Sequence, residues 1–292
     1  MNNGATRPTV GAVILTMNDR PDEFPKAMSS LLAQEGVDLD VVVVGNGCTP
    51  QQVADGVRTV ALAENVGIPE GRNIGADRVK GDYLFFFDND ALLPTSHVLA
   101  QLVARLEADL GLAYTQPRIA DPDSGITLRR WVPRLRASDP ARPGIVTVMA
   151  EGVVMVRRSA FDQVDGWPGS FFLYHEGVDL AWRLWDHGYR GYYMPDVIVH
   201  HPATHPSRHA AFYRLNARNR VWLARRRLPR LLIPVNLAIW AAVTLWRTRG
   251  LPALRASIAG FLEGLRGACG TREPMSWNTV ARLTRAGRPP AF

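Results

Sequence analysis

Lysine is almost absent from this chain, since only Lys26 and Lys80 occur among 34 basic residues. Cysteine is scarce as well, and Cys48 and Cys269 lie too far apart to form a metal-ligand pattern. This excludes a cysteine-based metal site and is typical of a reducing compartment. The opening residues, MNNGATRPTV, contain no apolar signal segment, so a cytoplasmic protein is expected.

The chain also lacks low-complexity tracts and internal repeats. Its 292 residues, 47% hydrophobic and 21% charged, have an ordinary globular composition with enough apolar content for a core. The length predicts one large or two small domains.

Charge is distributed unevenly along the chain. Residues 206–292 contain 16 arginines and only two acids, Glu263 and Glu273, which gives this segment a net charge of +14 and leaves −7 for residues 1–205. We therefore expect two regions, 1–205 and 206–292, with different partners. The basic region predicts a polyanionic partner such as nucleic acid, an anionic membrane surface or a phosphorylated lipid. A solvated arginine-rich surface is the alternative.

The first 110 residues alternate between two hydrophobic patterns. Short apolar runs predict strands at 10–15, 41–44, 58–62 and 83–87, and helical spacing predicts helices at 22–34, 51–57, 69–79 and 95–109. This alternation predicts an α/β fold with a mostly parallel sheet and helices on both faces.

The pattern changes after Leu112. Short strands are expected at 112–116, 146–150 and 153–156, with a long loop, 117–144, that is typical of a functional lid. A helix over 176–187 and a strand over 192–200 follow.

The C-terminal region contains an uncharged run, 231–246, between Arg230 and Arg247. It is shorter than the roughly 20 residues that a spanning helix needs. Residues 251–265 form a second helical pattern. Two interpretations remain open: a helical hairpin lying on a membrane surface, or a helical cap on the sheet domain or a dimer contact. The first predicts peripheral membrane association.

The strongest functional indication is the triplet Asp88-Asn89-Asp90, directly after the apolar run 83–87. Ligands bind at the carboxyl ends of strands in open α/β sheets. Two carboxylates two residues apart can converge on one divalent cation, which in turn can hold a diphosphate. The alternative is an ordinary turn that caps the next helix.

Polar or glycine-rich turns follow all four predicted strands of the first half. They are Thr16 to Asn18, residues 45–47, residues 65–67 leading into 71–75, and the acidic triplet. Their repetition predicts a line of nucleotide-binding loops at one edge of the sheet.

With these motifs in place, residues 8–220 resemble the inverting glycosyltransferases of family 2, which have the GT-A fold. The residues that carry the resemblance are ILTMN at 14–18, ENVGIPEGRNIGA at 64–76, GDYLFFFDNDALL at 81–93, EGVVMVRRSAF at 151–161, FFLYHEGVDLAWRLWDHGYR at 171–190 and the strand that ends at His200 and His201. Within the family, the chain is most similar to bacterial rhamnosyltransferase-like members that build cell-surface polysaccharides.

The resemblance implies roles for particular residues. Asp88 would face the ribose or the metal, Asp90 would ligate Mg²⁺ or Mn²⁺, and His200 would be a further metal ligand, unless it is an ordinary surface histidine. Arg72 would contact phosphate, although a surface ion pair with Glu70 or Asp77 is the alternative. The nucleotide-sugar site implied in this way comprises Thr16, Asn18, Asn46, Asn65, Gly67, Arg72, Asn73, Asp88 and Asn89.

Two positions depart from the family pattern. Gly45 stands where an aspartate is usual, and the acidic motif Glu-Asp-x-Asp reads Glu176-Gly177-Val178-Asp179, so the expected base is missing. Inverting transfer needs a base near the acceptor hydroxyl. We therefore expect Glu176 to be the base, with Asp179 as the second candidate. Either acid could instead stabilise the start of its helix.

Together these features predict a metal-dependent inverting glycosyltransferase that moves a sugar from a dTDP- or UDP-sugar to a glycan, lipid-linked or natural-product hydroxyl. The expected localisation is cytoplasmic, with peripheral contact to the inner face of the membrane, and a homodimer is possible. A non-catalytic nucleotide-sugar binder and a nucleotidyltransferase are alternatives, although Thr16 to Arg20 lacks the glycine- and lysine-rich loop of the latter. The acidic first region argues against nucleic acid as a partner.

Overall fold

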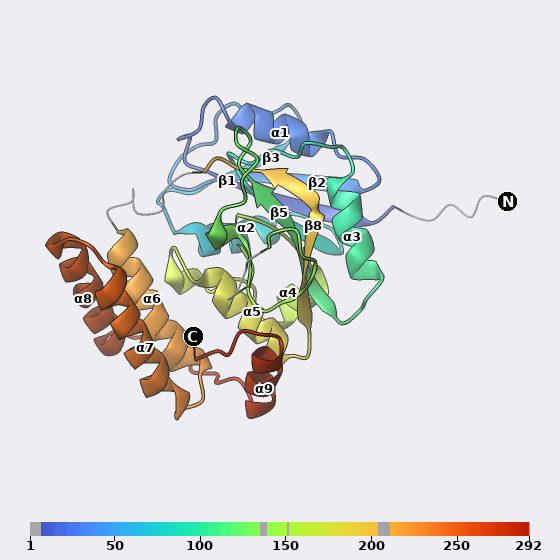
Figure 1. Ribbon diagram of the computed structural model, residues 1–292. Coiled ribbons are helices and arrows are strands. Elements are labelled where there is room, and N and C mark those ends of the chain that lie inside the picture. The colour runs from blue at the N-terminus through green and yellow to red at the C-terminus, as the bar shows by residue number, and fades with distance from the viewer. Residues whose placement is uncertain (1–6, 135–138, 151, 204–210, 292) are drawn as a thin grey trace.

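The computed structural model describes residues 7–134, 139–150, 152–203 and 211–291. Its centre is an eight-stranded sheet with the order β3-β2-β1-β4-β7-β5-β8-β6 (Figure 1). Helices cover both faces of this sheet, and a helical C-terminal region lies to one side. The α/β fold predicted from the alternating pattern is confirmed.

The first half of the sheet is parallel. β1 (Thr9–Thr16) lies between β2 (Asp38–Gly45) and β4 (Tyr83–Asp88), and β3 (Arg58–Ala61) pairs with β2 at the edge. The apolar runs of β1, β2 and β4 are buried, as expected for parallel strands covered on both faces. Their carboxyl ends therefore come together at one edge of the sheet.

Two hydrophobic clusters separate the two faces. On one face, α1 (Phe24–Leu32) and α3 (Val98–Glu107) pack on alternate residues of β1 such as Ile14. On the other face, the side chain of Val13 belongs to the cluster that includes α2 (Ile68–Ala76), α4 (Arg158–Gln163) and α5 (Glu176–Asp186). The strand period of two thus divides β1 between two helical layers.

The second half of the sheet is mixed. β7 (Val153–Arg157) runs antiparallel to both β4 and β5 (Leu112–Ala120). β8 (Arg190–His200) is parallel to β5, and β6 (Gly144–Val146) forms the antiparallel edge.

Three local predictions were wrong. Residues 51–57 form turns rather than a helix, and the strand predicted at 146–150 ends at Val146. The predicted loop 117–144 is shorter than expected, because β5 continues to Ala120 and a 3₁₀ helix occupies Arg129–Trp131. Residues 135–138 of that loop, and Glu151 of the motif at 151–161, lie outside the described residues.

The C-terminal region consists of α6 (Phe212–Arg227), α7 (Leu232–Arg247), α8 (Leu251–Arg266) and α9 (Trp277–Arg285). A third hydrophobic cluster joins this region to α5, with Trp182 and Trp185 of α5, Trp222 of α6 and Leu283 of α9. Within the described residues, no helix is long and apolar enough to cross a membrane.

α8 lies unusually close to α6. A Cβ placed on Gly260 would collide with the backbone oxygen of Arg214, and one on Gly264 would lie 2.7 Å from the Cβ of Val221. Together with Ser257 these glycines are the buried residues of α8. Small side chains on one face therefore allow the two helix backbones to approach each other.

Candidate active site

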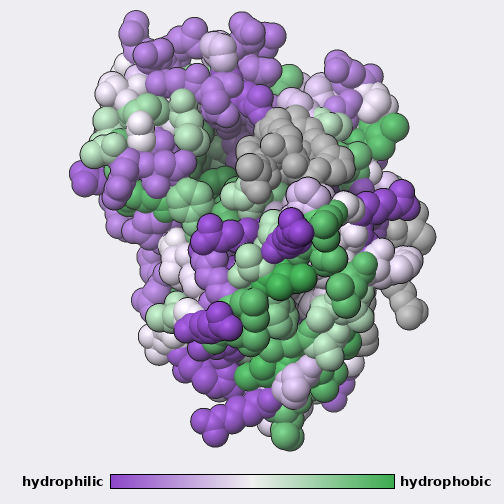
Figure 2. All heavy atoms as spheres, turned by 90° about the vertical axis from the view of Figure 1, so that its left-hand side faces the viewer, coloured by the Kyte–Doolittle hydropathy of each residue, from purple (hydrophilic) through white to green (hydrophobic). Residues whose placement is uncertain are grey.

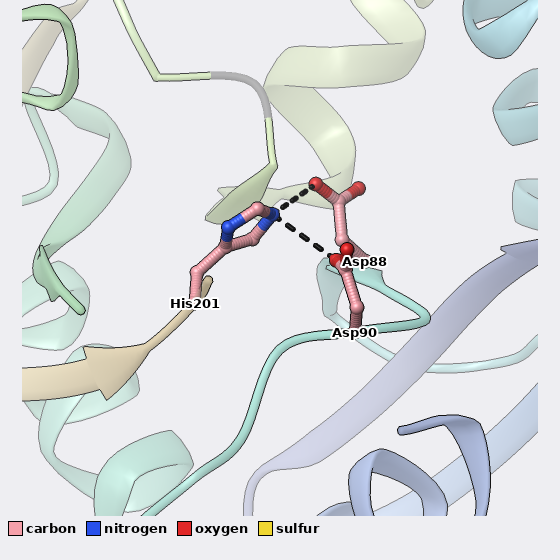
Figure 3. Close-up of side chains that lie close together, drawn as sticks. All are labelled: Asp88, Asp90 and His201. Atoms are coloured by element: carbon pink, nitrogen blue, oxygen red, sulfur yellow. Dashed lines mark ion pairs between the residues drawn. The ribbon is translucent and has the colours of Figure 1, made fainter. Parts of the chain in front are cut away.

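Three side chains converge beyond the carboxyl ends of β4 and β8 (Figure 3). The Nε2 atom of His201 lies 3.1 Å from Oδ1 of Asp90 and 3.5 Å from Oδ2 of Asp88. One donor atom from each residue fits within 4.8 Å of the other two. Two carboxylates and an imidazole suit Mg²⁺ or Mn²⁺, so this donor set fits the divalent ion implied by the family resemblance.

The histidine in this cluster is His201, whereas the sequence analysis assigned the role to His200. His200 is the last residue of β8, and its backbone N–H and C=O pair with Leu92. Successive side chains of an extended strand point to opposite sides. His201 therefore presents its ring to the aspartates, where the ring also packs edge-on against Trp131 with centroids 5.6 Å apart.

The two aspartates are surrounded by positive groups. Arg72 Nη2 lies 2.8 Å from Asp88 Oδ1, and Arg20 Nε lies 3.1 Å from Asp90 Oδ2. Burial favours neutral His201, but its hydrogen bonds and charge attraction to Asp88 and Asp90 outweigh burial and raise its pKa to about 10. Because a metal binds neutral imidazole, a cation that bound at His201 would displace this proton.

Asp88 is also confined from the side of β7. A Cβ on Gly152 would collide with the Asp88 carboxylate, and the Asp88 backbone N–H donates to the Gly152 carbonyl over 3.0 Å. Glycine at position 152 therefore leaves room for the Asp88 carboxylate beside the neighbouring strand.

Arg72 is buried in the middle of α2 and its partner is Asp88, not the expected alternatives Glu70 or Asp77. Its guanidinium carbon lies 5.3 Å from the ring centroid of Trp167. The Nη1 atom is buried and has no hydrogen-bond partner among the described residues. A buried guanidinium nitrogen next to the acidic cluster is suited to donate a hydrogen bond to an oxygen of a bound phosphate.

Trp167 supports Arg72 from the core. The indole is buried and meets Phe86 edge-on at 5.1 Å. Asn73 fixes the backbone at this point, because its side chain donates to the Trp167 carbonyl and accepts from the Trp167 N–H, both over 2.9 Å. These two hydrogen bonds hold the backbone of Trp167 against Asn73.

The predicted base and ribose loops are joined by asparagine side chains. Asn46 is buried, donates to Oδ1 of Asn65 over 2.9 Å and to the Gly67 carbonyl over 3.2 Å, and accepts from the Val66 N–H. The loops after β2 and β3 are thus held together by one amide. Asn65 in turn accepts from the Gly67 N–H.

The loop after β1 has similar internal bonds. Asn18 adopts a positive φ of 57°, donates from its backbone to Oγ1 of Thr16, and donates from its side chain to the Thr49 carbonyl over 2.9 Å. Asn89, in the acidic triplet, donates to the same Thr16 hydroxyl at 3.4 Å. Thr16 therefore links the first loop to the triplet.

The loop after β2 explains the first departure from the family pattern. A Cβ at Gly45 would collide with the Cys48 carbonyl oxygen and approach Pro50 Cδ at 2.7 Å. The turn at Cys48 to Pro50 thus occupies the space that an aspartate side chain would need.

The second departure lies at the start of α5. Glu176 and Gly177 are buried there, and His175 precedes them in the left-handed conformation with φ 69°. Asn219 of α6 donates to three carbonyls of the preceding loop, those of Phe171, Leu173 and Tyr174, at 2.7–2.9 Å. The segment that delivers Glu176 is therefore held in place from α6.

Asp179 is fully buried between two arginines. Its Oδ2 accepts from Nε of Arg183 and its Oδ1 accepts from Nε of Arg227, both at 2.7 Å. Burial alone would raise the pKa of Asp179, but the two guanidinium groups outweigh it and the pKa is lowered. A carboxylate held in this way is poorly suited to accept a proton from an acceptor.

Sequence reasoning missed two groups at the site, His201 and Arg20. Arg20 follows the predicted loop of Thr16 to Asn18 by two residues. The adjacent His200 and His201 indicated a histidine near the aspartates, but the sequence did not show which of the two it is.

The glycosyl transferase family 2 model matches residues 12–165. This is more than half of the chain, and the chain belongs to that family. A segment of 110 residues is 34% identical to N-acetylglucosaminyl-diphospho-decaprenol L-rhamnosyltransferase of Mycobacterium tuberculosis and covers 36% of this chain and 32% of that protein. The chain thus matches about a third of the length of this relative.

Solved structures share the fold. A mannosyltransferase of Pyrobaculum calidifontis, PcManGT in complex with GDP-Man and Mn²⁺, aligns with a TM-score of 0.57 at 18% identity over 97% of this chain and 80% of the other. GalNAc-T7 with UDP, GalNAc and Mn²⁺ aligns with a TM-score of 0.63 at 14% identity over 98% of this chain and 59% of the other. The chain therefore has the GT-A fold of these glycosyltransferases, in agreement with its membership of glycosyl transferase family 2.

Proposed function

We propose that the protein transfers a sugar, with inversion, from a dTDP- or UDP-sugar to an acceptor hydroxyl in a metal-dependent reaction. The observation that carries this proposal is the convergence of Asp88, Asp90 and His201 at the carboxyl ends of the strands. The Mn²⁺ in the two fold relatives supports the same cation class. Mg²⁺ or Mn²⁺ held by these three residues would neutralise charge on the diphosphate leaving group.

The residues around the cluster would bind the phosphate or position the loops for the base and ribose. Arg72, whose buried Nη1 atom has no hydrogen-bond partner in the described part of the chain, would bind a phosphate oxygen. Thr16, Asn18, Asn46, Asn65 and Gly67 shape the loops that would bind the base and ribose, and Asn73 and Asn89 hold neighbouring segments.

In the transfer step, an acceptor oxygen would form a bond to the anomeric carbon as the bond from that carbon to the diphosphate oxygen breaks. Glu176 would take the acceptor proton, and the nucleoside diphosphate would leave with the electron pair of the broken bond. Glu176 is preferred to Asp179 because Asp179 is committed to two arginines. A general base of this kind contributes about 10²–10⁴-fold to the rate.

The acceptor class is inferred from the relatives. The rhamnosyltransferase resemblance supports a glycan or lipid-linked acceptor rather than a nucleic acid. A lipid-linked acceptor would bring a cytoplasmic enzyme to the inner face of the membrane. We extend the proposal to this localisation.

A non-catalytic nucleotide-sugar binder is the second candidate, and one observation favours it. Gly177 occupies the position where the family pattern has the aspartate of its acidic motif. Binding of a donor and Mn²⁺ without turnover, over a broad panel of acceptors, would support this candidate.

The test is thermal unfolding with a panel of nucleotides and nucleotide-sugars, with and without Mn²⁺. A ligand at 100 times its dissociation constant adds about 2.7 kcal/mol of stability. We expect a Mn²⁺-dependent increase for dTDP or UDP and their sugars, and its loss in Asp90→Ala. An unchanged unfolding temperature with every diphosphate nucleotide would reject the donor site.

A further inference from the structure

The C-terminal region exposes an apolar surface on α7 and α8. Trp246 is 79% exposed, Leu245 is 64% exposed and Leu251 is 58% exposed. Ile258, Leu262 and Leu265 of α8 are also exposed, and their spacing places them on one side of that helix. We call these six residues the α7–α8 face.

Figure 2 shows this surface from the left-hand side of Figure 1, with hydrophobic residues gathered over the lower, C-terminal half of the molecule. An apolar cavity of about 200 Å³ opens between α6, α7 and α8. Ala217 and Val221 of α6, Trp240 of α7 and Phe261 of α8 help to line it. Large exposed apolar patches of this kind mark interaction sites.

Arginines surround the apolar surface. Arg230, Arg247, Arg249, Arg255 and Arg266 are exposed at the ends or on the sides of α7 and α8. Glu263 is the single acid in residues 211–272. It is turned toward α6, where it accepts from Arg214 at 2.7 Å and from Arg218 at 3.4 Å. The outward charge of this face is therefore positive.

The dimensions favour a helix that lies on a bilayer rather than one that crosses it. α7 has 16 residues, which corresponds to about 24 Å of helix, whereas the hydrocarbon core is about 30 Å thick. Apolar side chains with arginines beside them match the two layers of a leaflet, acyl chains below and anionic headgroups above. A symmetric dimer through this face would bring two surfaces of the same positive charge together.

We propose that the α7–α8 face inserts into the surface of an anionic lipid bilayer. The apolar side chains enter the acyl boundary while the arginines contact the headgroups. This inference names the surface for the membrane contact in the proposed function. It does not need a donor, a metal or turnover, so its failure and that of the donor site can be told apart.

The experiment is flotation of the full chain with vesicles of phosphatidylcholine containing one-quarter phosphatidylglycerol, and with phosphatidylcholine alone. We expect binding to the anionic vesicles that weakens as salt is raised. The double variant Leu245→Ser/Trp246→Ser should partition more than about tenfold less. The matched control is Trp277→Ser on α9, which removes a 54% exposed tryptophan outside the face and should float like the unchanged chain.

A second pair of variants separates charge from apolar contact. Arg247→Glu/Arg249→Glu should reduce binding to anionic vesicles, whereas Arg78→Glu, an exposed arginine on the sheet domain, should not. Unfolding temperatures of all variants establish that each is folded. Equal flotation of folded Leu245→Ser/Trp246→Ser and Trp277→Ser would overturn the proposal. The proposal would also be overturned if the chain did not bind vesicles but formed a concentration-dependent dimer in sedimentation, and if Leu245→Ser/Trp246→Ser abolished that dimer.

Discussion

Arg227 Nε donates to Asp179 Oδ1 over 2.7 Å, so a residue of α6 neutralises a carboxylate on α5 that has no exposed surface. Arg183 completes the pairing from one turn further along α5. The interaction ties the C-terminal region to the sheet domain at a point where charge would otherwise be costly.

Replacing the Asp179 carboxylate should reduce the stability of the fold more than the rate of transfer. We expect Asp179→Asn to lower the free energy of unfolding by about 3 kcal/mol, since it leaves two buried guanidinium groups without their counter-charge. Denaturant unfolding measures the change. Asp162→Asn, at an exposed position, is the control. A variant as stable as that control but without turnover would return Asp179 to the role of base.

The choice between the adjacent histidines predicts different effects on metal binding. His201→Ala should weaken Mn²⁺ binding at least about tenfold in calorimetric titrations with the donor nucleotide present. His200→Ala should leave it nearly unchanged, because His200 pairs with Leu92 through its backbone, which the substitution retains. Weaker binding in His200→Ala alone would contradict the geometry in Figure 3.

Glu176 is expected to act after the donor has bound. Glu176→Gln should reduce kcat by about 10²–10⁴-fold while the Mn²⁺-dependent increase in unfolding temperature with donor persists. Near-normal turnover of Glu176→Gln would exclude this residue as the base. Because the amide has almost the same volume as the acid, the comparison isolates the proton acceptor.

Arg72 is expected to tolerate no conservative replacement. Lysine cannot reproduce a planar group that contacts Asp88 and faces the ring of Trp167 at once. We predict that Arg72→Lys weakens donor binding by about tenfold or more, measured by titration with a nucleoside diphosphate and Mn²⁺. Arg78 is exposed and lies just after the end of α2, so Arg78→Lys is the control. Equal affinities of the two variants would remove Arg72 from the phosphate site.

The stability of the fold should decrease in mild acid because of His175. Burial and the adjacent Arg220 lower its pKa from 6.5 to about 3. The unfolded chain therefore takes up a proton below pH 6.5 that the folded chain refuses until about pH 3, and stability falls with pH across this window.

The variant His175→Asn tests this origin, since asparagine accepts the left-handed backbone at φ 69°. It should flatten the dependence of unfolding free energy on pH between 6.5 and 5 by up to one proton. An unchanged slope in His175→Asn would assign the acid sensitivity to other groups.

His201 contributes in the opposite sense at higher pH. Because its pKa is raised to about 10, its contribution to the stability of the fold is complete below pH 6.5 and is lost as pH rises toward 10.

Much of the fold was predictable because local patterns coincide with burial. The apolar run at 83–87 is β4, and its acidic end lies where the parallel sheet places ligands. Contacts over long sequence distances were not predictable. Arg227 and Asp179 are 48 residues apart, and no periodic pattern links them.

The local errors have physical causes. The structure brings His201 to the two aspartates instead of the predicted His200, because the sequence does not show where β8 ends and which side its last residues face. The helix α9 was not predicted, although Ser276 accepts the Thr279 N–H at 3.1 Å as an N-cap and so marks its start.

The two glycines of α8 have a mechanical consequence. With Gly260 and Gly264 pressed against α6, α8 has no compliant layer of side chains in which to slide. A displacement of α8 is therefore expected to move α6 with it. Asn219 of α6 in turn donates to the three carbonyls before Glu176. The proposed membrane contact at the α7–α8 face would therefore be coupled mechanically to the segment that carries Glu176.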